Sequence, residues 1–452
     1  MHLSLCPSYS LGVPGLKKTL IGLAVLVAAS VTLVACGSSS NSSGAHHASG
    51  LKFRAFVSNS LSGGFPVINI VDATQDVLSP STISLLGIVP QAGLMAVSPD
   101  LRLTLVFSPP GDIAVINNAT ESTASGVQVV SLPGLTESIA IANNSATAYA
   151  AVPAAPVSGQ APGAVIAINL ISGAVQATIP VPAAHYLVLS PDGSRLLVFS
   201  DNSNNVTVIA TGLIGTNNDP RQPVGGICCF DRPVWGIFAD SATAYIFDCG
   251  AECQGGVAAG ITTFDVGSPA PGPTVALSGA TYGILDGGVL YVAGTPPNTA
   301  CGGGAAGAPS CGTLNLVDVS SMKMINPNPI SITDGYHNRM AMGSNGQLFI
   351  GAKSCTSIGV IGDEIRGCLS IYNTSSSAVV IPPQIGDATG IEPIPGRHIV
   401  YVCEGGVFQV FDTTTDKLLV QVNPLPIDIV GYSIDVKVVD PPPSTCTMDC
   451  LP

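Results

Sequence analysis

Few side chains in this sequence could do chemistry, and none falls in a common hydrolase or metal-binding motif. The chain contains no GxSxG, no HExxH and no EF-hand loop. Only three histidines, His185, His337 and His398, follow residue 50, and a metal site built from histidines needs several of them to converge. The sequence therefore predicts no catalytic residue and no cofactor, and the remaining question is which residues could bind a ligand.

Aromatic and basic residues are the better candidates for binding, because they recur at the start of short apolar segments. Tyr186, Trp235 and Arg339 occupy equivalent places when these segments are aligned, and Tyr282 is one residue off. With their neighbours they form one candidate set. The candidate ligand-binding residues are His185, Tyr186, Trp235, Tyr282, His337 and Arg339, with Tyr336 and Asn338 beside the last two.

A pocket of this composition could bind a sugar, an acidic metabolite or a peptide end. The alternative is that the aromatic side chains only pack between structural repeats. In that case Arg339 would pair with a carboxylate such as Glu392.

Cys36 is predicted to carry a lipid. Lys17 and Lys18 precede an uncharged run, residues 19–35, which closes on LVAC. This run is short for a membrane span, and its positive flank and small terminal residues are typical of a signal peptide. Together these features resemble a bacterial lipoprotein signal (1–35), in which the peptidase cuts before a diacylated cysteine, followed by a Gly/Ser tether (36–50). An uncleaved anchor or a plain secretory signal is the alternative. The expected location is the cell envelope, outside the cytoplasm.

Eleven further cysteines predict disulfides, because export places them in an oxidising compartment. Cys301 and Cys311 bracket one loop and Cys355 and Cys368 bracket another, so each pair is expected to join locally. The other candidates are Cys446 with Cys450 in the tail, and the cluster of Cys228, Cys229, Cys249 and Cys253.

The pairing within the cluster is open, and Cys403 is left over. The alternative to disulfides at the cluster is a zinc site with four thiolate ligands, because Cys249 and Cys253 are four residues apart and structural zinc accepts four cysteines. Disulfides are preferred, since an oxidising compartment favours the bond between sulfur atoms.

The elements that position these residues are short strands in a repeat. Ser98-Pro99-Asp100 recurs 92 residues later, and the segment SATAY at 145–149 recurs 96 residues later. The two series interleave, so the unit is about 46 to 48 residues, the length of one four-stranded propeller blade. The apolar residues come in short runs without sustained helical spacing. The sequence therefore predicts an all-β propeller over residues 51–440 and a tail over 441–452.

Each unit reads as strand A, a tight turn, strand B, a loop, strand C and strand D. Strand C ends in Asp or Asn in seven units, and the side chain is expected to bond the main chain two residues on. The seven residues are Asp72, Asn117, Asn169, Asp265, Asp318, Asn373 and Asp412, and Ala210 takes the place in the eighth unit. Eight A and eight B candidates predict eight blades, and seven is the alternative because the spacing is irregular. The first unit begins at strand B, whereas residues 432–440 supply an unpaired strand A. We expect this last strand to complete the first blade and close the ring.

The repeat resembles the YVTN-type β-propeller repeat. SPDG at 190–193, FVSN at 56–59, YVCE at 401–404 and VFDTTT at 410–415 carry the resemblance. It implies the fold but not an activity, because that family and its relatives include surface proteins, lactonases and quinoprotein enzymes.

In such a ring the B-to-C and D-to-A connections share one face, here called the long-loop face.

The net charge of −13 and the scattered basic residues argue against nucleic acid as a partner. The expected function is therefore a membrane-anchored scaffold that binds a protein, peptide or glycan at this face. The alternative is a lactonase-like hydrolase or a quinoprotein-like oxidoreductase with its site at the channel mouth.

Overall fold

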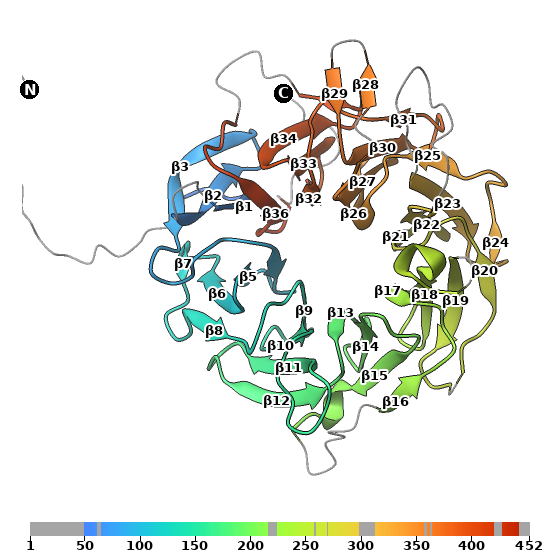
Figure 1. Ribbon diagram of the computed structural model, residues 1–452. Helices are drawn as coiled ribbons and strands as arrows, with labels where there is room; N and C mark the ends of the chain where they lie inside the picture. The colour runs from blue at the N-terminus through green and yellow to red at the C-terminus, as the bar shows by residue number, and fades with distance from the viewer. Residues whose placement is uncertain are drawn as a thin grey trace, which may run out of the picture. The chain divides into compact units, whose positions relative to one another are not determined.

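Short runs of valine, isoleucine, leucine and alanine form the strands of eight four-stranded antiparallel blades around a common axis. The prediction of an eight-bladed propeller is confirmed, and the seven-bladed alternative is wrong. Figure 1 shows the blades as a ring with one strand of each toward the centre. The computed structural model describes residues 49–60, 65–215, 224–256, 259–268, 270–297, 312–356, 359–361, 364–419 and 427–442. The predicted sites at Cys36, Cys301, Cys311, Cys446 and Cys450 lie outside these residues.

Each blade runs from an inner strand A to an outer strand D. The A strands are β36 (Ser433–Val438), β4 (Met95–Val97), β9 (Ser138–Ile141), β13 (Ala184–Leu189), β17 (Pro233–Phe238), β21 (Tyr282–Asp286), β26 (Tyr336–Met342) and β32 (Ala388–Pro393). The B strands are β1 (Arg54–Ser60), β5 (Leu103–Ser108), β10 (Thr147–Val152), β14 (Arg195–Ser200), β18 (Thr243–Asp248), β22 (Val289–Gly294), β27 (Gln347–Lys353) and β33 (Ile399–Glu404).

The C strands are β2 (Pro66–Asp72), β6 (Asp112–Asn117), β11 (Ala164–Asn169), β15 (Val206–Ala210), β19 (Gly260–Asp265), β23 (Gly312–Asp318), β30 (Leu369–Asn373) and β34 (Val407–Asp412). The outer strands are β3 (Val77–Ser84), β7 (Ser122–Thr123) with β8 (Val129–Ser131), β12 (Val175–Pro180), β16 (Val224–Ile227), β20 (Thr274–Ala276), β24 (Lys323–Met324) with β25 (Ile330–Ile332), β31 (Val379–Val380) and β35 (Lys417–Leu418). A hairpin, β28 (Gly359–Ile361) and β29 (Glu364–Arg366), and two short 3-10 turns, η1 (Thr211–Leu213) and η2 (Gly250–Cys253), complete the described elements.

The predicted turns after strand C are confirmed. Asp72, for example, accepts a hydrogen bond from the Thr74 main-chain N–H at 2.8 Å, and Asn169 accepts one from Ile171 at 2.8 Å. The same contact follows the other five Asp and Asn residues of the series. These residues therefore shape the turns at the blade edge.

The ring closes where the sequence predicts. Strand β36 pairs antiparallel with β1, so the last strand of the chain becomes strand A of the first blade. Buried Arg54 reinforces the closure, because its guanidinium lies 2.6 Å from Glu121 of the second blade and 2.8 Å from Asp440 beyond β36. Closure removes the free sheet edges that an open array of blades would leave.

The hydrophobic core lies between neighbouring blades. One cluster packs Leu187 and Val198 of the fourth blade against Tyr149 and Val165 of the third, and similar clusters fill the other interfaces. This packing leaves the faces of the ring and its axis free for other roles. The described residues include no helix long and apolar enough to cross a membrane.

Candidate functional site

The inner strands carry a recurrent irregularity near the channel mouth. In β13, β17, β26 and β32 the pairing with strand B skips one residue, at His185, Val234, Asn338 and Thr389 respectively. Such β-bulges re-aim the side chains around them and are frequent beside functional sites. The same distortion occurs at Ile434 of β36, so it recurs at equivalent positions in five blades.

The register explains the alignment of the candidate residues. Tyr186, Trp235, Tyr282 and Arg339 each pair with the fifth residue of their strand B. Strand β21 has no bulge. Tyr282 therefore reaches the same place although the sequence alignment sets it one residue off.

These four side chains share one cavity on the axis, which we call the axial pocket. Its volume is about 250 Å³, and seven of the eight inner strands contribute to its walls. The A strands of the first, second and third blades contribute Asp435, Met95 and Ser138 to the walls, in that order. The structure thus brings together residues from blades that are far apart in the sequence.

The aromatic side chains of the pocket contact one another in a row. The rings of Trp235 and Tyr282 lie 4.8 Å apart and are tilted by 32°. Tyr186 meets Trp235 edge to face at 6.1 Å, and His185 stacks on Tyr186 at 4.1 Å. Tyr186, Trp235 and Tyr282 form an aromatic wall on one side of the pocket, and His185 extends the row beyond it.

Arg339 brings a positive charge to the pocket. Its Nε donates to the carbonyl of Thr389 at 3.0 Å, and one Nη donates to the carbonyl of Asn338 at 2.9 Å. Arg339 forms no ion pair with any residue that the structure describes, so the pairing with Glu392 considered from the sequence is wrong. Glu392 instead lies 3.5 Å from Lys437.

The second cation of the pocket is neutralised by its neighbours. The Lys437 ammonium lies 3.2 Å from Asp435 as well as close to Glu392. Burial alone would lower the pKa of Lys437, but the charges of the two carboxylates raise it. Lys437 therefore remains charged and fully paired, whereas Arg339 keeps donor capacity for a ligand.

A second hollow of about 410 Å³ lies beside the axial pocket, and we call it the outer hollow. Glu137, Tyr186, Val234 and Tyr336 line both cavities. The outer hollow also takes in residues of the B-to-C loops, such as Asn202 and Gln254. It is therefore the entrance to the axial pocket from the long-loop face.

A charged cluster stands at the boundary between the two cavities. Glu137 lies 3.1 Å from the Lys353 ammonium, which belongs to the blade opposite in the ring, and 3.6 Å from His185 Nε2. His185 Nδ1 lies 2.7 Å from Asp201. The cluster therefore links the third, fourth and seventh blades across the mouth of the channel.

The pKa values within this cluster are displaced in opposite directions. Burial alone would lower the pKa of His185, but hydrogen bonds and charges from Asp201 and Glu137 raise it to about 9. The hydrogen bond from His185, opposed by burial and assisted by Lys353, lowers the pKa of Glu137 to about 2. At neutral pH His185 is thus a cation held between two carboxylates.

His337 does not line either cavity. It is fully buried beside Gly312 of the neighbouring blade, and its Nε2 lies 3.0 Å from the carbonyl of Thr333. Burial, partly offset by that carbonyl, lowers its pKa to about 4. It packs between blades rather than facing a ligand, because it precedes the bulge at Asn338.

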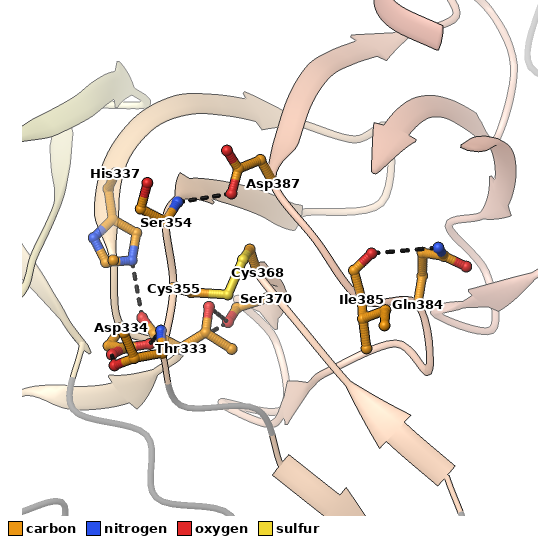
Figure 2. The surroundings of a disulfide bond; sticks show 12 residues. Thr333, Asp334, His337, Ser354, Cys355, Cys368, Ser370, Gln384, Ile385 and Asp387 are labelled. Carbon is orange, nitrogen blue, oxygen red and sulfur yellow. Dashed lines mark hydrogen bonds between the residues drawn. A yellow bond between two sulfur atoms is a disulfide. The ribbon is translucent and has the colours of Figure 1, made fainter. Parts of the chain in front are cut away.

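Disulfides hold two of the loops on the long-loop face. Cys355 is joined to Cys368, and Figure 2 shows this bond beside the hydrogen bond between Thr333 and Ser370. Cys249, directly before η2, is joined to Cys253 at the end of η2. Both bonds follow strand B, so they restrain loops that lead away from the channel mouth.

Cys228 and Cys229 form a vicinal disulfide, and Cys403 is a buried free thiol. The four cysteines of the cluster are thus paired as two neighbouring couples. In the part of the chain that the structure describes, no group of three or more His, Cys, Asp or Glu residues is arranged to hold a metal ion.

Several residues of the site were not foreseen from the sequence. They are Glu137, Asp201, Lys353, Asp435 and Lys437. Glu137 could have been found, because it directly precedes strand A of its unit, as Tyr336 and His337 precede Arg339 in theirs. The others come from strand B, a loop or the closing strand, and no local pattern marks them.

No protein-family model and no curated protein matches the sequence. Solved structures match it in fold. The dihydro-heme d1 dehydrogenase NirN in complex with DHE is 14% identical, with a TM-score of 0.59 over 87% of this chain and 76% of that one. Apo AztD from Citrobacter koseri is 12% identical, with a TM-score of 0.51 over 86% and 98%. BamB from Moraxella catarrhalis is 13% identical, with a TM-score of 0.50 over 75% and 87%.

The chain is therefore a β-propeller, with eight blades and a pocket on its axis. At these identities the similarity shows the fold alone. The YVTN family stays a prediction.

Proposed function

We propose that this chain is an extracytoplasmic β-propeller that binds a ligand at its long-loop face, with the axial pocket as the binding site. The observation that carries the proposal is the convergence of side chains from seven inner strands on one small cavity with an aromatic wall. Concave, mostly apolar pockets with a few directed polar groups are the usual form of ligand sites. The ligand would be a small molecule, a glycan residue or the end of a peptide.

We also propose that a lipid on Cys36 anchors the protein to a bacterial membrane in the cell envelope. The lipobox LVAC and the Gly/Ser tether support this part of the proposal. The disulfides of the exposed loops are consistent with an oxidising compartment. A tethered ring could capture a ligand or hold a partner at the membrane.

An enzyme is the second candidate, and one observation favours it. At the mouth of the channel His185 lies beside two carboxylates, Glu137 and Asp201. In a hydrolase a histidine and a carboxylate in such contact could act as general acid and general base. A general base must be unprotonated at the working pH, however, and the two carboxylates raise the pKa of His185 to about 9. The cluster therefore suits a structural ion pair better than proton abstraction, and binding is the preferred function.

The fluorescence of Trp235 tests the proposal. Trp235 is the only tryptophan of the chain and lines the axial pocket, so its emission reports occupancy directly. The full chain, purified in detergent, is titrated with a panel of sugars, sugar acids, amino acids and short peptides. A saturable change in emission with at least one compound is expected.

Tyr282→Ala should weaken that binding, because Tyr282 forms the wall with Trp235. Phe65→Ala is the matched control, since Phe65 is an exposed aromatic residue outside both cavities. Binding that both variants leave unchanged would place the site elsewhere and refute the proposal.

A further inference from the structure

We infer that the axial pocket selects a small ligand that carries both a carboxylate and hydroxyl groups, an acidic monosaccharide or sugar acid. The inference rests on the proposed function, because it names the class of ligand for the same pocket. Three independent features of the pocket point to this class: a cation without a carboxylate partner, a buried acceptor without a donor, and a wall of aromatic rings.

Arg339 supplies the site for the carboxylate. Its hydrogen bonds to described residues run from Nε to the main-chain carbonyl of Thr389 and from one Nη to that of Asn338. The second Nη has no acceptor among the described residues. A guanidinium presents its donors in a planar fork that fits a carboxylate. An anionic ligand would therefore neutralise the one charge of the pocket that the protein leaves unpaired.

The other charged groups at the axial pocket already have partners. Lys437 lies between Asp435 and Glu392, and Glu137 lies between Lys353 and His185. Asp435 also accepts hydrogen bonds from the main-chain N–H groups of Met95 and Val436. A cationic ligand would meet Arg339 without a free carboxylate to receive it, so charge selects an anion.

Asn338 supplies the second feature. Asn338 is only 4% exposed and is one of the residues that line the axial pocket. Its buried Oδ1 atom has no hydrogen-bond donor among the described residues. A buried acceptor that stays unpaired costs about 1 to 3 kcal/mol. Because Oδ1 is buried, the Asn338 side chain would have to turn toward the ligand to accept a hydroxyl, and that hydrogen bond would remove the cost. A simple carboxylate without hydroxyl groups could not do so.

The aromatic wall and the size of the pocket complete the class. Trp235 and Tyr282 offer ring faces of the kind on which the apolar face of a pyranose packs. The volume of about 250 Å³ lies just below the range of about 300 to 1,000 Å³ that holds drug-sized ligands. One sugar ring with its carboxylate is therefore a better match than an oligosaccharide.

Isothermal titration calorimetry with D-glucuronate and D-glucose tests the inference, because the two probes differ only at C6, where glucuronate has a carboxylate and glucose a hydroxymethyl group. The full chain should bind D-glucuronate more tightly than D-glucose by about tenfold or more, the strength of one charge-assisted hydrogen-bonding contact. Arg339→Gln should remove this preference, so that D-glucuronate and D-glucose bind with similar affinity. Arg339→Lys should retain part of it, since it keeps the charge but loses the fork.

Two controls keep the result interpretable. Arg102→Gln removes an exposed arginine that pairs with Asp100 in a tight turn away from both cavities, and it should leave the preference intact. Thermal unfolding of each variant shows whether it is folded. Asn338→Leu should weaken the binding of both sugars, because both would donate a hydroxyl to Oδ1.

Equal affinity for the two sugars, or a preference that survives in a folded Arg339→Gln protein, would overturn the inference. The proposed function would still stand if other compounds changed the emission of Trp235. Failure of the whole panel to change that emission would overturn the proposed function as well.

Discussion

Replacing His185 with glutamine should remove a pH-dependent part of the free energy of unfolding. Burial opposes protonation of His185, but hydrogen bonds and charges from Asp201 and Glu137 outweigh it and raise the pKa from 6.5 to about 9. The folded state thus binds this proton more tightly than the unfolded state. The stabilisation is fully present below pH 6.5 and is lost as the pH rises through about 9.

The magnitude follows from the same two pKa values. The difference between 6.5 and about 9 corresponds to about 3 kcal/mol. This is an upper value, because the side chain is 27% exposed and solvent screens the pair. The lowered pKa of Glu137 reflects the same interaction with His185. The free energies that correspond to the two pKa shifts therefore must not be added together.

Urea unfolding, followed through the emission of Trp235, measures the effect at about pH 6 and about pH 10. The wild type should lose up to about 3 kcal/mol more than His185→Gln between these values. His398→Gln is the control, since His398 contacts the Ser344 hydroxyl at 2.8 Å and no carboxylate among the described residues. An identical pH dependence in the wild type and His185→Gln would refute the account of the cluster.

Three further predictions concern the frame around the site. Glu121→Gln should lower the free energy of unfolding by about 3 kcal/mol, because it leaves the buried Arg54 guanidinium with only part of its charge compensation; urea unfolding that matches the wild type would contradict this. Replacing both Cys355 and Cys368 with serine should lower the free energy of unfolding by about 3 kcal/mol, because the loop that they close gains freedom in the unfolded state. A variant with the same thermal midpoint as the wild type, and a wild type whose midpoint is the same in reducing and oxidising buffer, would count against this. Cys36→Ala should move the protein from the membrane fraction to the soluble fraction, as fractionation and immunoblotting would show, and retention in the membrane would rule out lipid anchoring through this residue.

The architecture could be predicted because its signals are local and repeated. The SPD turns recur along the chain, and seven of the eight C strands end in Asp or Asn. These residues make the turn contacts expected of them, as Asp72 and Ser190 illustrate. The closing strand could be predicted because the first unit begins at strand B. Such signals arise from turn geometry, which a few adjacent residues determine.

The site could be predicted only in part. Alignment of the A strands identified Tyr186, Trp235 and Arg339, because all three occupy the same register position. His337 was grouped with them, but it lies before the bulge and faces a neighbouring blade. Periodicity alone cannot locate a bulge, since one extra residue reverses the direction of the side chains that follow.

The ion pairs across the channel had no signal in the sequence. Glu137 and Lys353 are 216 residues apart, and they meet because the third and seventh blades stand opposite each other in a ring of eight. The partners of Lys437 likewise come from the closing of the ring. Contacts of this kind depend on the number of blades, which the irregular spacing of the repeats left between seven and eight.

A crystal structure of the full chain grown with saturating D-glucuronate tests the central claim most directly. The account predicts ligand density in the axial pocket, with the sugar ring against Trp235 and Tyr282, the carboxylate at Arg339 and a hydroxyl at Asn338. Ligand density on the rim of the loops, or an axial pocket that holds only water, would contradict it.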